Sequence, residues 1–101
     1  MVRIHGSWCG PNWTQGKSQP ANASGVDFSA PCKDALDCAC RSHDRDCSNS
    51  LGCSAKADRK LVVAALKYAA NPINRLFRPQ TVIKAEAVAV GISAASLTRK
   101  R

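Results

Sequence analysis

The sequence predicts a small, mainly α-helical domain that is held together by disulfide bonds. Three observations predict it: the chain has 101 residues, it contains six cysteines, and apolar residues recur at helical spacing after residue 30. A chain this short buries a limited core and commonly needs crosslinks. An even number of cysteines at this density indicates three disulfide bonds and an oxidising compartment, and sequence alone leaves their pairing open. We expect a single domain over residues 1–101.

Residues 1–30 are predicted to form a loop region, because Gly, Pro, Asn and Ser interrupt them throughout. Within this region, segment 8–16 reads Trp-Cys-Gly-Pro-Asn-Trp-Thr-Gln-Gly. Gly and Asn tolerate unusual backbone angles, so several carbonyl oxygens can point at one hard cation. Trp8 and Trp13 are expected either in the core or at a membrane interface, and the sequence leaves both alternatives open.

Residues 31–71 are predicted to form a pair of helices. The first begins near Ser29–Pro31, with Ser29 as N-cap, and runs to about Cys47. The second runs from Ala55 to Asn71 and is capped by Ser54. A short connection makes the two helices antiparallel neighbours.

Residues 72–101 are predicted to be a C-terminal extension. Segment 72–80 is expected to be a basic linker, because it begins and nearly ends with proline and carries two arginines. A third helix is expected from about Thr81 to Leu97, although Gly91 and β-branched residues weaken it. The tail 98–101 is expected to be a frayed, soluble end, with nucleic-acid binding or nuclear import as the alternative.

His43 is the centre of the predicted site. At about 100° per residue, Cys40 and Cys47 lie on the same face of the first helix as His43. That face is partly apolar, so we expect it to pack inward and to carry His43 with it. Asp44 is rotated away and can serve a different partner. Asp58, in the first turn of the second helix, interacts either with the helix dipole or with His43.

Three functions are compatible with these residues. In the first, His43 is a general base oriented by Asp58, and water attacks an ester whose carbonyl a calcium ion polarises. In the second, a zinc ion is bound by a Cys/His set; the candidate ligands are Cys38, Cys40, His43, Cys47 and Cys53. In the third, nothing is catalytic, and the basic surface of a crosslinked domain binds a receptor or polyanion.

The chain resembles the secreted phospholipase A2 superfamily, and it looks most like the short bacterial and viral members. The family hallmark is a calcium loop of the type aromatic-Cys-Gly-x-Gly, followed by a helix with Asp-x-x-Cys-x-x-His-Asp. Here the loop is Trp8–Asn12 and the helix motif is Asp37–Asp44. The resemblance covers residues 7–62 and leaves residues 72–101 outside it.

The resemblance implies calcium-dependent hydrolysis of the sn-2 ester of glycerophospholipids at a membrane surface. It implies that His43 activates water, that Asp58 orients His43, and that the Gly10 N–H stabilises the oxyanion. It also implies a calcium ligand set made of the Asp44 side chain and three loop carbonyls, those of Trp8, Gly10 and Asn12. Asn12 stands where the family usually has Gly.

A disulfide pairing follows in part from the same resemblance. It implies a bond between Cys9 and Cys40, which would hold the loop beside the helix. The other four cysteines do not match the vertebrate pattern; we expect the pairs Cys32–Cys38 and Cys47–Cys53.

The formal net charge of +8 favours anionic partners. We expect a monomer that docks on an anionic phospholipid surface, with no nucleic acid bound. The residues expected to dock are Trp8, Trp13, Lys17, Arg41 and Arg45. The N-terminus has no apolar leader, so we expect a secreted chain with its signal removed, another export route, or a domain of a larger, for example viral, protein.

Overall fold

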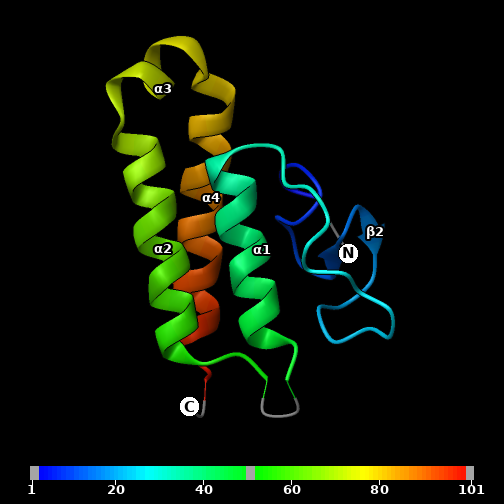
Figure 1. Ribbon diagram of the computed structural model, residues 1–101. Helices are drawn as coiled ribbons and strands as arrows, with labels where there is room; N and C mark the ends of the chain where they lie inside the picture. The colour runs from blue at the N-terminus through cyan, green and yellow to red at the C-terminus, as the bar shows by residue number, and fades with distance from the viewer. Residues whose placement is uncertain (1–2, 50–51, 100–101) are drawn as a thin grey trace.

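The computed structural model describes residues 3–49 and 52–99. In chain order its elements are β1 (Trp13–Thr14), β2 (Lys17–Ser18), α1 (Ala35–Cys47), α2 (Ala55–Ala70), α3 (Pro72–Phe77) and α4 (Pro79–Ser96). Figure 1 shows α1, α2 and α4 side by side, with α2 antiparallel to the other two. The N-terminal region lies against the outer side of α1, and α3 closes the far end of the α2–α4 hairpin (Figure 1). The prediction of a small, mainly helical, disulfide-bonded domain is confirmed.

α1 begins later than predicted. Its N-cap is Asp34, whose side chain accepts a hydrogen bond from the Asp37 N–H at 2.9 Å. Ser29 is not the cap, because its N–H and hydroxyl both donate to Asp27 in a local turn. The expected end at Cys47 is confirmed.

α2 agrees with the prediction at its start and nearly at its end. The Ser54 hydroxyl accepts from the Ala57 N–H at 3.2 Å, as a Ser N-cap should. The helix ends at Ala70, and Asn71 follows as its C-cap. The buried face of α2 contains Ala65 but not Leu66, which is half-exposed.

The predicted linker 72–80 is wrong, because most of it is helical. Asn71 caps α3 by accepting from the N–H groups of Ile73 and Asn74. Pro72 and Pro79 each occupy the first turn of a helix, where a missing N–H costs no hydrogen bond. The third predicted helix exists as α4, and it starts two residues earlier than expected.

Residues 1–30 are not all loop. β1 and β2 form an antiparallel hairpin that pairs Trp13 with Ser18. Its two turn residues, Gln15 and Gly16, have φ of 54° and 70°, the backbone that a two-residue hairpin turn requires. This hairpin gives segment 8–16 a fixed shape.

Three disulfides join the six cysteines, in the pairs Cys9–Cys40, Cys32–Cys38 and Cys47–Cys53. All three predicted pairs are confirmed. Such crosslinks are compatible with an oxidising compartment. Within the described part of the chain, no helix has the length and apolar character needed to cross a membrane.

The core lies where α4 packs along α2 and α2 packs against α1. Fully buried side chains from the N-terminal region, chiefly Trp8, complete it. The largest aliphatic contributors are Leu36, Leu61, Val82 and Val88. α1 is thus wedged between the α2–α4 hairpin on one side and the N-terminal region on the other, which fixes both faces of the helix that carries His43 (Figure 1).

Candidate functional site

Asp37 holds the N-terminal segment against α1. Its carboxylate is fully buried and accepts hydrogen bonds from three backbone N–H groups, those of Ser7 at 3.2 Å, Trp8 at 2.9 Å and Lys33 at 2.8 Å. Gly6 lies against the same carboxylate, and a Cβ at this position would come within 2.4 Å of Asp37 Cγ. The sequence motif contains Asp37, but this role was not predicted.

The Cys9–Cys40 disulfide makes a second connection between the same two elements. Cys40 lies one helical turn before His43, so the bond places segment 8–16 beside His43 and Asp44. A crosslink that spans 31 residues also restricts the unfolded chain, by about 3–4 kcal/mol in the loop-entropy model.

His43 and Asp58 form a buried pair across α1 and α2. His43 Nε2 lies 2.7 Å from Asp58 Oδ1, and the two side chains are 8% and 1% exposed. Because an ionised carboxylate only accepts hydrogen bonds, Nε2 carries a proton, and in the neutral form of the ring Nδ1 keeps its lone pair. A direct contact between the two side chains is therefore compatible with the expected role of Asp58 in orienting His43.

Arg99 extends this pair from the other end of the chain. Its Nε lies 2.8 Å from Asp58 Oδ2, and a second guanidinium nitrogen lies 3.4 Å from Oδ1. Burial would raise the pKa of Asp58, but the hydrogen bonds and charges of Arg99 and His43 outweigh it, so the pKa is lowered. Residues 98–99 were expected to fray, and that expectation is wrong for Arg99; Lys100 and Arg101 lie outside the described residues.

Asp44 faces segment 8–16 rather than α2. Its Oδ2 is buried and has no hydrogen-bond partner among the described residues, while the Thr14 hydroxyl bonds to the carboxyl group. Burial raises the pKa of Asp44 to about 8, and the nearby Asp37 charge adds to the shift, against the hydrogen bond from Thr14. A buried carboxylate oxygen without a partner is the arrangement that a bound cation would stabilise.

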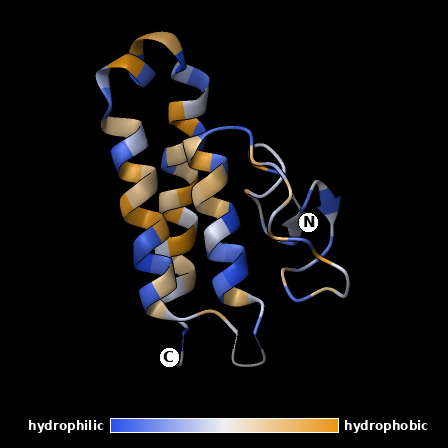
Figure 2. Ribbon diagram, viewed as in Figure 1, coloured by the Kyte–Doolittle hydropathy of each residue, from blue (hydrophilic) through white to orange (hydrophobic). Residues whose placement is uncertain are grey.

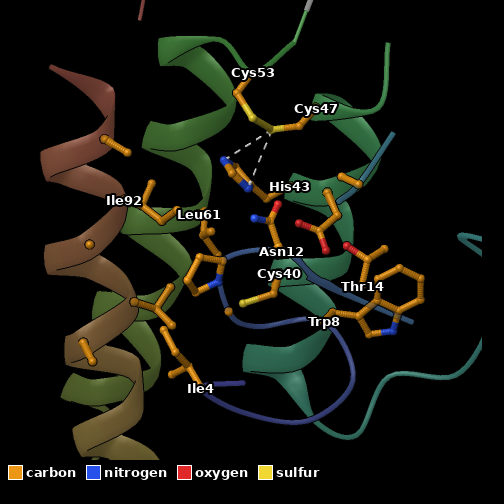
Figure 3. A pocket seen from close by; sticks show the side chains of 18 of the residues that line it. Ile4, Trp8, Asn12, Thr14, Cys40, His43, Cys47, Cys53, Leu61 and Ile92 are labelled. Atoms are coloured by element: carbon orange, nitrogen blue, oxygen red, sulfur yellow. Dashed lines mark hydrogen bonds between the residues drawn. A yellow bond between two sulfur atoms is a disulfide. The ribbon is translucent and has the colours of Figure 1, made fainter. Parts of the chain in front are cut away.

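His43, Asp44 and Arg99 line one cavity of about 520 Å³. One wall is polar, and Figure 3 shows His43, Asn12 and Thr14 there, drawn around a common space. The other wall is apolar and comes from α2, α4 and the N-terminal segment; its larger side chains are Leu61, Val88, Ile92 and Ile4. The cavity therefore combines a titratable pair with room for an apolar group.

The predicted loop ligands lie at the same cavity. Trp8, Gly10 and Asn12 all line it, together with Asp44. Asn12 has a φ of 52° and Gly10 a φ of 144°, backbone angles that Asn and Gly tolerate better than other residues. The Gly10 carbonyl oxygen accepts a 3.3 Å hydrogen bond from the Trp13 N–H. A carbonyl oxygen has two lone pairs, so the second lone pair of Gly10 could serve another donor or a cation. One carboxylate plus backbone carbonyls is a donor set that suits calcium.

The thiol ligands of the zinc alternative are all paired in disulfides. His43 Nδ1 or Nε2 and the sulfurs of Cys47 and Cys53 do lie within 4.8 Å of one another. Those two sulfurs are bonded to each other, however, and zinc binds thiolates rather than disulfides. This group would offer thiolate ligands only after reduction.

The expected membrane-docking residues do not form one exposed face. Trp8 is 1% exposed and packs on Phe28, with ring centroids 5.7 Å apart, so its assignment to a membrane surface is wrong. Trp13 is half-buried and donates through Nε1 to the Gly6 carbonyl at 3.0 Å. Arg41 is half-buried and donates to the Ala30 carbonyl. Only Lys17 and Arg45 are exposed as expected.

Comparison with known proteins found no matching family model, no matching curated protein and no matching solved structure.

Proposed function

We propose that this protein is a calcium-dependent phospholipase A2, which hydrolyses the sn-2 ester of glycerophospholipids at a membrane surface in an oxidising compartment. The observation that carries the proposal is the 2.7 Å contact between His43 and Asp58 at the cavity that Asp44 also lines. A base held by a buried carboxylate, beside an unpartnered acidic oxygen, is the arrangement that water-based ester hydrolysis needs.

His43 acts as the general base in this proposal. Its Nδ1 takes a proton from a water molecule in the cavity as that water attacks the ester carbonyl. Asp58 keeps Nε2 protonated and stabilises the imidazolium that forms, while Arg99 keeps Asp58 ionised. The imidazolium then returns its proton to the leaving alkoxide, so His43 is regenerated. No serine or cysteine nucleophile is required.

Asp44 and the carbonyls of Trp8, Gly10 and Asn12 would hold the calcium ion. When bound, calcium supplies positive charge that polarises the ester carbonyl. The Gly10 N–H donates to the developing oxyanion as a second stabilising group. The apolar wall accommodates the acyl chain, because apolar surface removed from water contributes about 25 cal/mol per Å².

Positional analysis of the released acid tests the proposal. The substrate is a short-chain phospholipid below its micelle concentration, with different acyl chains at sn-1 and sn-2. We expect calcium-supported release of the sn-2 acid alone. Release of the sn-1 acid, or no release from the parent protein at any calcium concentration, would contradict it and would favour a binding module.

A further inference from the structure

Exposed large apolar side chains cluster at the end of the α2–α4 hairpin where α3 lies, and none of the residues in this cluster lines the cavity. Three large side chains of α3 point to solvent there: Ile73 is 63% exposed, and Leu76 and Phe77 are each 73% exposed. Ile83, in the first turns of α4, is 60% exposed. Figure 2 shows hydrophobic residues along this turn of the ribbon. We call these four residues the tip.

The tip is held in place by specific hydrogen bonds. Asn74 is buried and donates to the Tyr68 carbonyl at 3.1 Å. Arg78 donates to the Asn74 side chain at 3.2 Å, and Asn71 caps α3. The backbone beneath the apolar side chains is therefore ordered, and their exposure does not come from a loose loop. An ordered exposed apolar cluster typically marks an interaction surface.

The charged side chains nearest the tip are mainly cations, and the acidic side chain closest to it in sequence is the exposed Glu86, one turn after Ile83 on α4. Between residues 59 and 85 the sequence contains no Asp or Glu and carries six cations: Arg59, Lys60, Lys67, Arg75, Arg78 and Lys84. Arg75, Arg78 and Lys84 lie beside the tip in sequence and are exposed. Two such surfaces would repel each other, which disfavours a dimer through the tip. Nucleic acid would use the cations but not four aliphatic or aromatic side chains.

We propose that the tip inserts into the surface of a membrane containing anionic phospholipid. Its apolar side chains enter the boundary between headgroups and acyl chains, while Arg75, Arg78 and Lys84 remain at the level of the acidic headgroups. This surface takes the place of the tryptophan face that the sequence suggested.

The tip and the catalytic pair lie at opposite ends of α2. Asp58 is in the first turn of α2 and α3 follows its last residue, so about 20 Å of helix separates them at about 1.5 Å per residue. None of the four tip residues lines the cavity. The inference goes beyond the proposed activity, since it requires neither calcium nor hydrolysis.

Flotation with vesicles of ether-linked phospholipids tests the proposal, because these lipids have no ester to cleave. Chelator is present throughout. The double variant Leu76→Gln/Phe77→Gln removes half of the tip, and Val90→Gln is its matched control, since Val90 is 71% exposed on α4 away from the tip. A second variant, Arg75→Gln/Lys84→Gln, removes two of the flanking cations.

We expect the parent protein and Val90→Gln to float equally with phosphatidylserine-containing vesicles. The tip variant should bind at least about tenfold more weakly, and the charge variant about fivefold more weakly for each cation removed. Circular dichroism should show the parent fold in every variant. The proposal would be overturned if the parent protein did not bind the vesicles, or if Val90→Gln lost as much binding as the tip variant. It would also be overturned if the parent formed a dimer that the tip variant does not form, and neither bound vesicles.

Discussion

His43 and Asp44 are adjacent on α1 and face different partners, one across to α2 and the other toward segment 8–16. In the proposed mechanism their substitution therefore has separable effects. His43→Gln should lose essentially all turnover and keep calcium binding, since Gln cannot accept a proton from water. Asp44→Asn should lose both. Turnover of soluble substrate and calorimetric calcium titration measure these effects, and unchanged calcium affinity in Asp44→Asn would exclude Asp44 as the ligand.

Arg99 is expected to act as a positioning residue for the His43–Asp58 pair. Arg99→Ala should lower turnover by about tenfold and leave calcium affinity unchanged. It should also shift the acid limb of the pH–rate profile to higher pH, because the pKa of Asp58 rises when the Arg99 guanidinium no longer lowers it, and a protonated Asp58 no longer accepts the hydrogen bond from His43. Arg59→Ala, an exposed arginine on α2, is the matched control. An unchanged pH–rate profile in Arg99→Ala would mean that Arg99 has only a structural role.

The raised pKa of Asp44 makes stability depend on pH. The folded pKa of about 8 lies above the ordinary carboxyl pKa of 3.8, so the folded state binds the proton more tightly than the unfolded state. Without a divalent cation, stability is therefore greatest below about pH 4 as far as Asp44 is concerned, and falls as pH rises toward 8. Denaturant unfolding in chelator should show this fall in the parent and not in Asp44→Asn, and calcium should reverse it. A parallel pH dependence in both proteins would contradict the assignment.

At the scale of elements, the connection between the N-terminal segment and α1 depends on Gly6 as much as on the disulfide. Gly6 has a φ of 61° and no room for a Cβ beside Asp37. Gly6→Ala should cost about 2 kcal/mol or more. Gly91→Ala, in α4 with open space around it, should instead stabilise by about 0.5–1 kcal/mol. Urea unfolding separates the two, and equal effects would mean that the close approach at Gly6 is not rigid.

Local signals in the sequence predicted the helices well where no distant residue competed. Ser54 caps α2 as its position indicates. Ser29 does not cap α1, because its N–H donates a hydrogen bond to the Asp27 side chain in a local turn. The prediction of a linker at 72–80 is wrong because a proline can occupy the first turn of a helix as well as interrupt one. Here Asn71 caps α3, and this cap favours a helix that begins at Pro72.

At the scale of the whole molecule, the contacts that sequence reasoning missed are those made between residues far apart. Arg99 reaches Asp58 across 41 positions, and no local pattern near either residue indicates that contact. Trp8 is buried because its backbone N–H donates to Asp37 and the neighbouring Cys9 is bonded to Cys40, and both contacts hold its segment against the core. The His43–Asp58 pair was predictable because a short loop makes α1 and α2 antiparallel.

The molecule places two chemically different surfaces at its ends. The cavity with His43 and Asp44 on one wall lies near the start of α2, and the exposed, cation-flanked tip lies beyond its end. A radius of gyration of 12.8 Å is close to the value of about 13 Å expected for a compact domain of this length.

The calcium dependence of turnover on soluble phospholipid tests the central claim most directly. The account predicts that turnover rises to saturation with added calcium, disappears with excess chelator and returns when calcium is restored, in the parent protein but not in Asp44→Asn. Release of the sn-2 acid at an undiminished rate in excess chelator would contradict it.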